Sequence, residues 1–232
     1  TARIPYGTRS KETVIKYFFQ SVRFLLTKDI KAIVIACNTA SALAMEEAQE
    51  AFEIPLLGVI EPGAKAAVSA TKNSIIGVIG TEGTINSQSY QRKIRQMLPS
   101  AEIIGIPCPL FVSIVEEGWE NTDVAYLTAK KYLLELKEHN IDSLVLGCTH
   151  YPALRYTINK VLGDNVILVN PAYETAKAAK IMLKEKNLLS NKADGGKCRF
   201  YVSDNPEKFK RVGGNMLKKE IASVEKVNIE SL

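Results

Sequence analysis

Residues 144–152 read LVLGCTHYP, an apolar run that ends on Gly147 and is followed at once by a cysteine, a threonine and a histidine. Residues 33–40, IVIACNTA, have the same construction around Cys37. The two stretches align without a gap at one constant offset, which for Cys37 and Cys148 is 148 − 37 = 111 residues. The chain therefore contains an internal repeat, and each copy places one thiol at the end of an apolar run.

Apolar runs alternate with amphipathic helical patterns along the chain. Residues 30–36 form a nearly continuous β-branched run, typical of a parallel strand that is buried on both faces, and residues 141–146 are its counterpart in the second copy. This alternation predicts an α/β architecture with mainly parallel sheets. We expect further strands at residues 55–59, 74–79, 101–106, 166–169 and 198–202, and helices that begin near residues 11, 38, 63, 86, 110, 122, 152, 175 and 206.

The repeat extends beyond the two cysteines. Pro62 in the first copy answers Pro171 in the second, and the sequence AKAA occurs at residues 64–67 and again at residues 176–179. Two similar, pseudo-symmetric α/β units are therefore expected to face each other. Because ligands of open α/β sheets bind at the carboxyl ends of the strands, we expect the two thiols on opposite sides of one cleft.

The composition is that of an ordinary soluble globular protein. Of 232 residues, 46% are hydrophobic and 24% are charged, which allows a sizeable core. The net charge of +5 comes without aromatic residues interleaved among the basic ones, so we expect no nucleic-acid partner. No apolar run approaches the ~18–20 residues of a membrane span, and no membrane partner is expected. With no secretory signal visible, the four cysteines indicate a reducing, cytoplasmic compartment.

Two opposed thiols suit the inversion of a stereocentre by proton transfer. Such an inversion needs a base on one face of the carbon and an acid on the other. A helix N-terminus with hydroxyl and amide donors lowers the pKa of a cysteine below its usual value of ~8.5, so we expect lowered pKa values at Cys37 and Cys148. The side chains of Asn38, Thr39 and Thr149 are placed to supply such donors and to hold a substrate carboxylate.

Other interpretations are open on these residues alone. A single buried cysteine is most simply a small packed side chain, and the two remaining cysteines are interpreted in that way. A metal site made of Cys37, Cys148 and His150 lacks the paired spacing of zinc ligands, and no G-x-G-x-x-G motif follows a strand, so we expect neither a metal nor another cofactor. His150 is better suited to assist the thiol of Cys148. Residues 80–84, GTEGT, are a weak candidate for an anion cradle.

Four stretches of the chain resemble the signature blocks of bacterial glutamate racemase, in the aspartate/glutamate racemase superfamily. They are residues 2–7 (ARIPYG), 36–40 (ACNTA), 108–118 (CPLF and VEEG at its ends) and 146–152 (LGCTHYP). The resemblance implies a PLP-independent amino-acid racemase, an isomerase that interconverts L- and D-glutamate without a cofactor. It also implies a cytoplasmic homodimer that supplies D-glutamate for peptidoglycan and hence for the cell wall and cell shape.

The resemblance also implies a role for each matching residue. Cys37 and Cys148 become the catalytic acid/base pair, with Cys37 acting on the D-enantiomer and Cys148 on the L-enantiomer. Glu116 and His150 match auxiliary positions. Substrate-binding positions are matched by Tyr6, Gly7, Asn38, Thr39, Thr149 and His150. The domains of the family are interleaved, which predicts a discontinuous first domain over residues 1–59 and 171–232 and a second domain over residues 60–170.

The chain departs from the family pattern at its start. Family members carry an N-terminal strand and an Asp-Ser-Gly turn ahead of the Pro-Tyr-Gly loop, and this sequence begins close to that loop. We interpret the chain as lacking both, and expect its activity to depend on whether that turn is dispensable. An aspartate-type racemase of the same superfamily and a truncated, non-catalytic dicarboxylate-binding protein stay as alternatives. A thiol-redox or metal protein is the last alternative.

Overall fold

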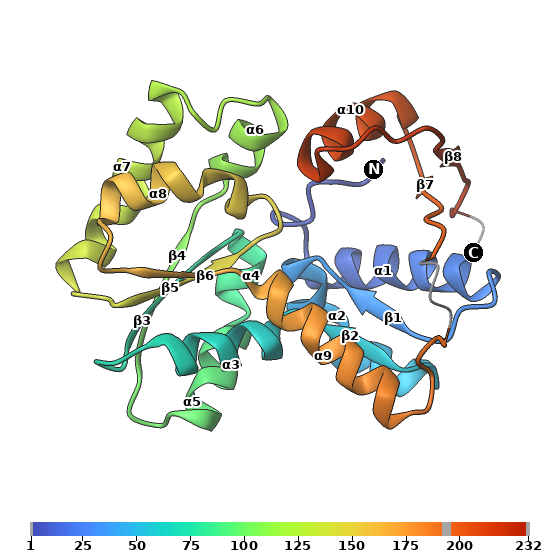
Figure 1. Ribbon diagram of the computed structural model, residues 1–232, viewed down its shortest axis with the longest axis horizontal. Coiled ribbons are helices and arrows are strands. Elements are labelled where there is room, and N and C mark those ends of the chain that lie inside the picture. The colour runs from blue at the N-terminus through green and yellow to red at the C-terminus, as the bar shows by residue number, and fades with distance from the viewer. Residues whose placement is uncertain (1, 192–195, 231–232) are drawn as a thin grey trace.

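The chain folds into two halves of alternating strands and helices that lie side by side (Figure 1). The computed structural model describes residues 2–191 and 196–230. Its strands form a four-stranded sheet in the order β4-β3-β5-β6 and two two-stranded sheets, β1-β2 and β7-β8. Each pair of neighbouring strands within these residues is parallel. The predicted α/β class with parallel sheets is therefore confirmed.

The four-stranded sheet carries a hydrophobic core on each face. Successive side chains of a strand point to opposite faces, and β5 shows this directly. Leu144 and Leu146 pack into the cluster formed with α6, α7 and α8, while Val145 packs into the cluster formed with α3 and α5. The strands are β3 (Ile75–Gly80), β4 (Glu102–Pro107), β5 (Ser143–Gly147) and β6 (Ile167–Val169). The helices are α3 (Ile60–Ala70), α5 (Ser89–Met97), α6 (Leu110–Glu116), α7 (Asp123–Glu138) and α8 (Arg155–Leu162).

The other half is built on β1 (Ile33–Ile35) and β2 (Leu56–Gly58), with α1 (Lys11–Leu26) and α2 (Asn38–Ala51) packed against them. Ile33 and Ile35 are buried in this core, but Val34 between them is 46% exposed. The expectation that this strand is buried on both faces is thus wrong, since the described residues cover the face that carries Val34 only in part.

The internal repeat appears as a repeat of parallel strand pairs. Ile33 of β1 lies opposite Leu56 of β2, and Leu144 of β5 lies opposite Leu168 of β6. In both copies a helix follows the cysteine-bearing strand and another helix follows the partner strand. The two cysteines therefore occupy equivalent places, each just beyond the carboxyl end of its strand.

The C-terminal segment returns to the first half of the molecule (Figure 1). The rings of Phe24 in α1 and Tyr201 in β7 meet edge to face at 5.2 Å between centroids. Gln20 Nε2 also donates to the carbonyl oxygen of Glu230 at 3.2 Å. The predicted domain division puts residues 1–59 and 171–232 in one unit and residues 60–170 in the other. These contacts support that division, which stays a prediction. The segment contains α9 (Pro171–Glu185), β7 (Tyr201–Val202), α10 (Pro206–Leu217) and β8 (Glu225–Lys226).

Several helix starts differ from the predicted ones. α5 begins at Ser89 rather than near residue 86, because Asn86 ends a separate short helix. α3 begins at Ile60 rather than near residue 63, and α9 begins at Pro171 rather than at 175, because proline is compatible with the first turn of a helix. A short helix, α4 (Glu82–Asn86), which the sequence did not predict, begins within the stretch 80–84, because the Thr81 hydroxyl accepts from the backbone N–H of Thr84 and caps it. Within the described ranges, no helix combines the length and apolar character that crossing a membrane requires.

Candidate active site

Cys37 lies between β1 and α2 and is the N-cap residue of that helix. Its backbone is extended, with φ −80° and ψ 122°, so the helix begins only at Asn38. The Sγ atom accepts a hydrogen bond from the backbone N–H of Ala40 at 3.5 Å. Because the first N–H groups of a helix have no intrahelical acceptor, they are available to a thiolate at this position.

Cys148 directly follows β5, all of whose residues are buried, and is itself 8% exposed. The backbone N–H of Tyr151 donates to the carbonyl of Cys148 at 3.1 Å, which turns the chain into the short 3-10 helix Tyr151–Leu154. This turn brings Nδ1 of His150 to 3.7 Å from the Cys148 Sγ atom. Thr149 is exposed, and its hydroxyl lies 3.5 Å from the same Nδ1 atom.

Burial dominates the ionisation of both thiols. It raises the pKa of Cys37, although the backbone N–H groups of Ala40 and Thr39 and the Thr39 hydroxyl act in the opposite direction. Burial likewise raises the pKa of Cys148 to about 12; the backbone N–H of His150 lowers it and the charge of Cys37 raises it. The expected lowering of the two pKa values is therefore wrong, because desolvation of the thiolate outweighs the nearby donors. The effect of Cys37 on Cys148 places the two thiols within electrostatic range of each other.

The two residues after Cys37 connect the two halves of the molecule. The Asn38 Oδ1 atom accepts a hydrogen bond from the hydroxyl of Tyr90 in α5 at 2.7 Å. The Thr39 hydroxyl lies 2.8 Å from that of Thr81 and 3.3 Å from that of Thr84. Asn38 and Thr39 are both buried, and with the hydroxyl groups of Tyr90, Thr81 and Thr84 they form a polar layer at the residues that directly follow Cys37.

Gly7 approaches α4 too closely for any side chain. A Cβ atom at Gly7 would lie 2.5 Å from Cβ of Thr81, and the carbonyl of Gly7 accepts from the backbone N–H of Gly83 at 2.9 Å. The neighbouring Tyr6 packs into the core of the first half, with its ring centroid 6.1 Å from that of Tyr17. Burial raises the pKa of the Tyr6 hydroxyl, and the charge of Cys37 adds to this effect.

A chain of polar contacts leads from Cys148 to the C-terminal helix. The Nε2 atom of His150 lies 3.4 Å from Oε1 of Glu116 at the end of α6. The second carboxylate oxygen of Glu116 accepts from Nζ of Lys208 in α10 at 2.8 Å. Burial lowers the pKa of His150, and the Glu116 carboxylate works against that lowering. His150 is thus held between a thiol on one ring nitrogen and a carboxylate on the other.

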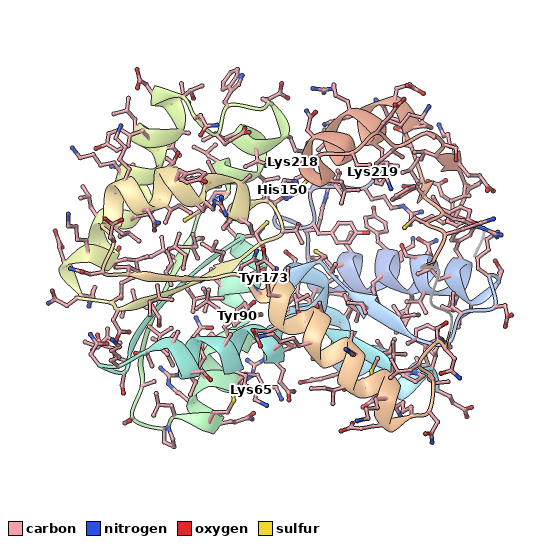
Figure 2. All side chains as sticks on the ribbon, in the orientation of Figure 1. Lys65, Tyr90, His150, Tyr173, Lys218 and Lys219 are labelled. Atoms are coloured by element: carbon pink, nitrogen blue, oxygen red, sulfur yellow. The ribbon has the colours of Figure 1, made fainter. Side chains whose placement is uncertain are left out.

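The structure places the predicted residues in two connected groups. Cys148, Thr149, His150 and Glu116 are linked by direct contacts. The other predicted residues surround Cys37 or the loop beside it, and Figure 2 shows both His150 and Tyr90 where the two halves meet. No three His, Cys, Asp or Glu side chains of the described residues gather in a way that could hold a metal ion.

Four residues of this arrangement lay outside the predicted set. Thr81 and Thr84 belong to the stretch 80–84, and their only signal in the sequence was a strand followed by small polar residues. Tyr90 and Lys208 gave no signal, since each reaches the site from a helix far away in the sequence. They are recognised only through their contacts.

Comparison with known proteins agrees with this geometry. A family model described as Asp/Glu/Hydantoin racemase matches residues 2–179. The glutamate racemase of Geobacter metallireducens is 46% identical over 231 residues, which cover 100% of this chain and 86% of that protein. The crystal structure of a glutamate racemase isoform from Bacillus anthracis matches with a TM-score of 0.94 and 39% identity, covering 98% of this chain and 85% of that one. A Francisella tularensis glutamate racemase, solved in complex with D-glutamate, matches with a TM-score of 0.93 and 40% identity over 100% and 86% of the two chains.

The chain therefore belongs to the Asp/Glu/hydantoin racemase family, and within it to the glutamate racemases. Its enzyme class is accordingly that of the amino-acid racemases, which are isomerases. The resemblance that the sequence motifs indicated is confirmed.

Proposed function

We propose that this chain interconverts L- and D-glutamate without a cofactor, with one thiolate of the pair Cys37 and Cys148 removing the Cα proton and the other thiol delivering a different, solvent-derived proton. The observation that carries this proposal is the equivalent placement of the two cysteines, each just beyond the carboxyl end of a strand in one copy of the repeat. One thiolate removes the proton from one face of the carbon, and the other thiol delivers a proton to the opposite face.

Both thiols carry raised pKa values, so the proposed reaction needs a cation close to them. The ammonium group of a bound amino acid is such a cation, because an opposite charge nearby favours the thiolate. His150 is placed to accept a hydrogen bond from the Cys148 thiol, since its Nδ1 atom lies 3.7 Å from Sγ and burial favours the neutral imidazole by lowering its pKa. Following the family resemblance, Cys148 serves the L-enantiomer and Cys37 the D-enantiomer.

We assign the remaining residues to substrate binding and to support of the thiols. Asn38, Thr39 and Thr149 supply amide and hydroxyl donors for the carboxylates, and the loop at Tyr6 and Gly7 lies next to this layer through the contact of Gly7 with Thr81. Glu116 orients His150 by the 3.4 Å contact between Oε1 and Nε2. These assignments rest on position and chemistry.

The choice of glutamate rests on the relatives. The proteins that are 39–46% identical to this chain are named glutamate racemases, and one of them was solved with D-glutamate. An aspartate racemase of Picrophilus torridus is 18% identical and shares the fold alone. From the same relationship we propose a cytoplasmic homodimer that supplies D-glutamate for peptidoglycan and so serves the cell wall and cell shape, with no nucleic-acid or membrane partner.

The experiment is a parallel assay with L-glutamate and L-aspartate, in which the D-enantiomer is quantified by chiral chromatography. We expect D-glutamate to form with the unaltered chain and with Cys198→Ala, and not with Cys37→Ala or Cys148→Ala. Cys198 is the matched control, because it is exposed and lies far from the site in the sequence. Preferential formation of D-aspartate would favour the aspartate-type alternative. Calorimetric binding of glutamate without turnover would favour a binding protein.

A further inference from the structure

The buried phenol of Tyr90 lies between the two cysteine-bearing strand ends. Tyr90 belongs to α5 of the second half and is 1% exposed. Its hydroxyl donates to Oδ1 of Asn38, the residue after Cys37, at 2.7 Å. Its ring also borders Gly147, the residue before Cys148, because a Cβ atom added there would lie 3.3 Å from Tyr90 Cε2. One side chain therefore contacts the residue next to each thiol.

The surroundings leave the phenol little choice of position. A Cβ atom at Gly63 would lie 2.9 Å from the Tyr90 hydroxyl, so the glycine provides the space that this oxygen occupies. The ring also belongs to the packed cluster on the α3 and α5 face of the sheet. Such a fixed donor can hold the group that it contacts in one orientation.

The chemistry of the contact decides which end of the Asn38 amide is available to a ligand. Burial raises the pKa of Tyr90, and the charge of Cys148 adds to this effect, so the hydroxyl keeps its proton. An amide has one acceptor oxygen and one donor nitrogen. Because the phenol donates to the oxygen, the NH₂ group is the part of Asn38 that remains to donate to a carboxylate or a thiolate.

We infer that Tyr90 is a positioning residue of the racemase, whose hydroxyl fixes the Asn38 amide with its NH₂ group available to the substrate. The inference rests on the proposed function, because it takes Asn38 as a substrate-binding residue. Tyr90 itself touches neither the reacting atoms nor the substrate. It acts on the reaction only through Asn38, and this separates it from a residue that merely packs.

The test is a double-mutant cycle in which Tyr90→Phe, Asn38→Ala and the combined variant are compared for kcat and KM with each enantiomer of glutamate. Phenylalanine keeps the ring and removes only the hydroxyl. We expect Tyr90→Phe to lower kcat/KM by about tenfold, the effect of losing one buried hydrogen bond. In the Asn38→Ala background the same substitution should have no further effect, since the group on which it acts is gone.

Tyr132→Phe is the matched control, because its hydroxyl lies on the same half of the molecule and accepts from the backbone N–H of Leu110 at 3.4 Å. This control should keep kcat/KM within about twofold, as a weak and partly exposed hydrogen bond predicts. Circular dichroism and thermal unfolding of every variant check that the fold is intact.

Two results would overturn the inference while leaving the proposed function in place. One is a kcat/KM of Tyr90→Phe equal to that of the unaltered chain. The other is an equal loss from Tyr90→Phe in the presence and absence of Asn38, which would assign the effect to packing. The same cycle measured on the Kd of D-glutamate by calorimetry gives a second readout that does not require turnover. An unaltered chain that neither binds nor converts glutamate would overturn the proposed function and the inference together.

Discussion

The ammonium group of Lys208 lies 2.8 Å from the carboxylate of Glu116, and this contact ties the C-terminal helix α10 to α6 of the second half. Glu116 is in turn 3.4 Å from His150, which lies 3.7 Å from the Cys148 thiol. The C-terminal segment thus takes part in holding His150, a predicted auxiliary residue. The side chain of Glu116 is only 18% exposed, so its charge is partly shielded from water.

Replacing Lys208 by glutamine should slow the reaction in both directions, because each direction uses the thiol of Cys148 as base or as acid. Glu116 then loses one partner and holds His150 less firmly. Partly exposed ion pairs contribute up to about 1 kcal/mol, so we expect a loss of no more than about fivefold in kcat, decreasing as salt is added. Initial rates with L- and D-glutamate at low and high ionic strength measure the effect. Lys210→Gln is the control, since Lys210 pairs with Glu207 on the same helix at 2.9 Å; equal losses in both variants would contradict the account.

Replacing Glu116 by glutamine should lower the pKa of His150 further. Burial already lowers this pKa, and the Glu116 carboxylate acts against burial by favouring the imidazolium form. With the carboxylate gone, protonation of His150 and the acid limb of the rate profile should both move to lower pH. Proton NMR titration of the imidazole measures the shift, and His139→Gln assigns the signal because the chain has two histidines. A His150 pKa that rises or stays constant in this variant would contradict the contact between Glu116 and His150.

The raised pKa values of the thiols predict slow alkylation at neutral pH. Thiolates are the reactive form, and burial raises the pKa of Cys148 to about 12 and also raises that of Cys37. Iodoacetamide at pH 7.5 should therefore modify the exposed Cys198 first, and modification of Cys37 and Cys148 should accelerate as the pH rises. Peptide mass spectrometry over a pH series gives the rate for each cysteine. Faster labelling of Cys37 or Cys148 than of Cys198 at pH 7.5 would contradict this prediction.

Gly7→Ala should destabilise the protein, because the new methyl group would lie 2.5 Å from Cβ of Thr81. Both partners are close to the backbone and have little room to move, so a loss of about 1–3 kcal/mol in the free energy of unfolding is expected. Thermal or urea unfolding measures it. Gly196→Ala is the control, since a Cβ atom there meets nothing within 4 Å; two variants of equal stability would show that the loop yields easily.

The sequence allowed the cysteine-bearing strands and their equivalence to be predicted, because the repeat is gap-free around Cys37 and Cys148 and continuous apolar runs mark buried strands. The contact of His150 with Cys148 could also be predicted, since only Thr149 lies between them in the sequence and a tight turn brings them together. Local patterns thus located the core of the candidate site.

The long-range contacts could not be predicted, because local patterns do not relate residues that are far apart in the sequence. Tyr90 and Asn38 are 52 residues apart, and Lys208 and Glu116 are 92 apart, so no local pattern relates them. The direction of the thiol pKa shifts was also missed, because donors at a helix N-terminus are visible in a sequence whereas the degree of burial is not. The short helix α4 was not predicted, because its capping residue, Thr81, lies in a stretch that also fits a loop.

The central claim is that two different thiols act on opposite faces of one carbon. Its most direct test is proton and deuterium NMR of L-glutamate and, separately, D-glutamate in D₂O at early reaction times. The account predicts that the product enantiomer carries deuterium at Cα while the recovered substrate keeps its proton, and that Cys37→Ala and Cys148→Ala each form no opposite enantiomer. Deuterium appearing equally in recovered substrate and product, turnover that survives either substitution, or no exchange by the folded, unaltered chain would contradict it.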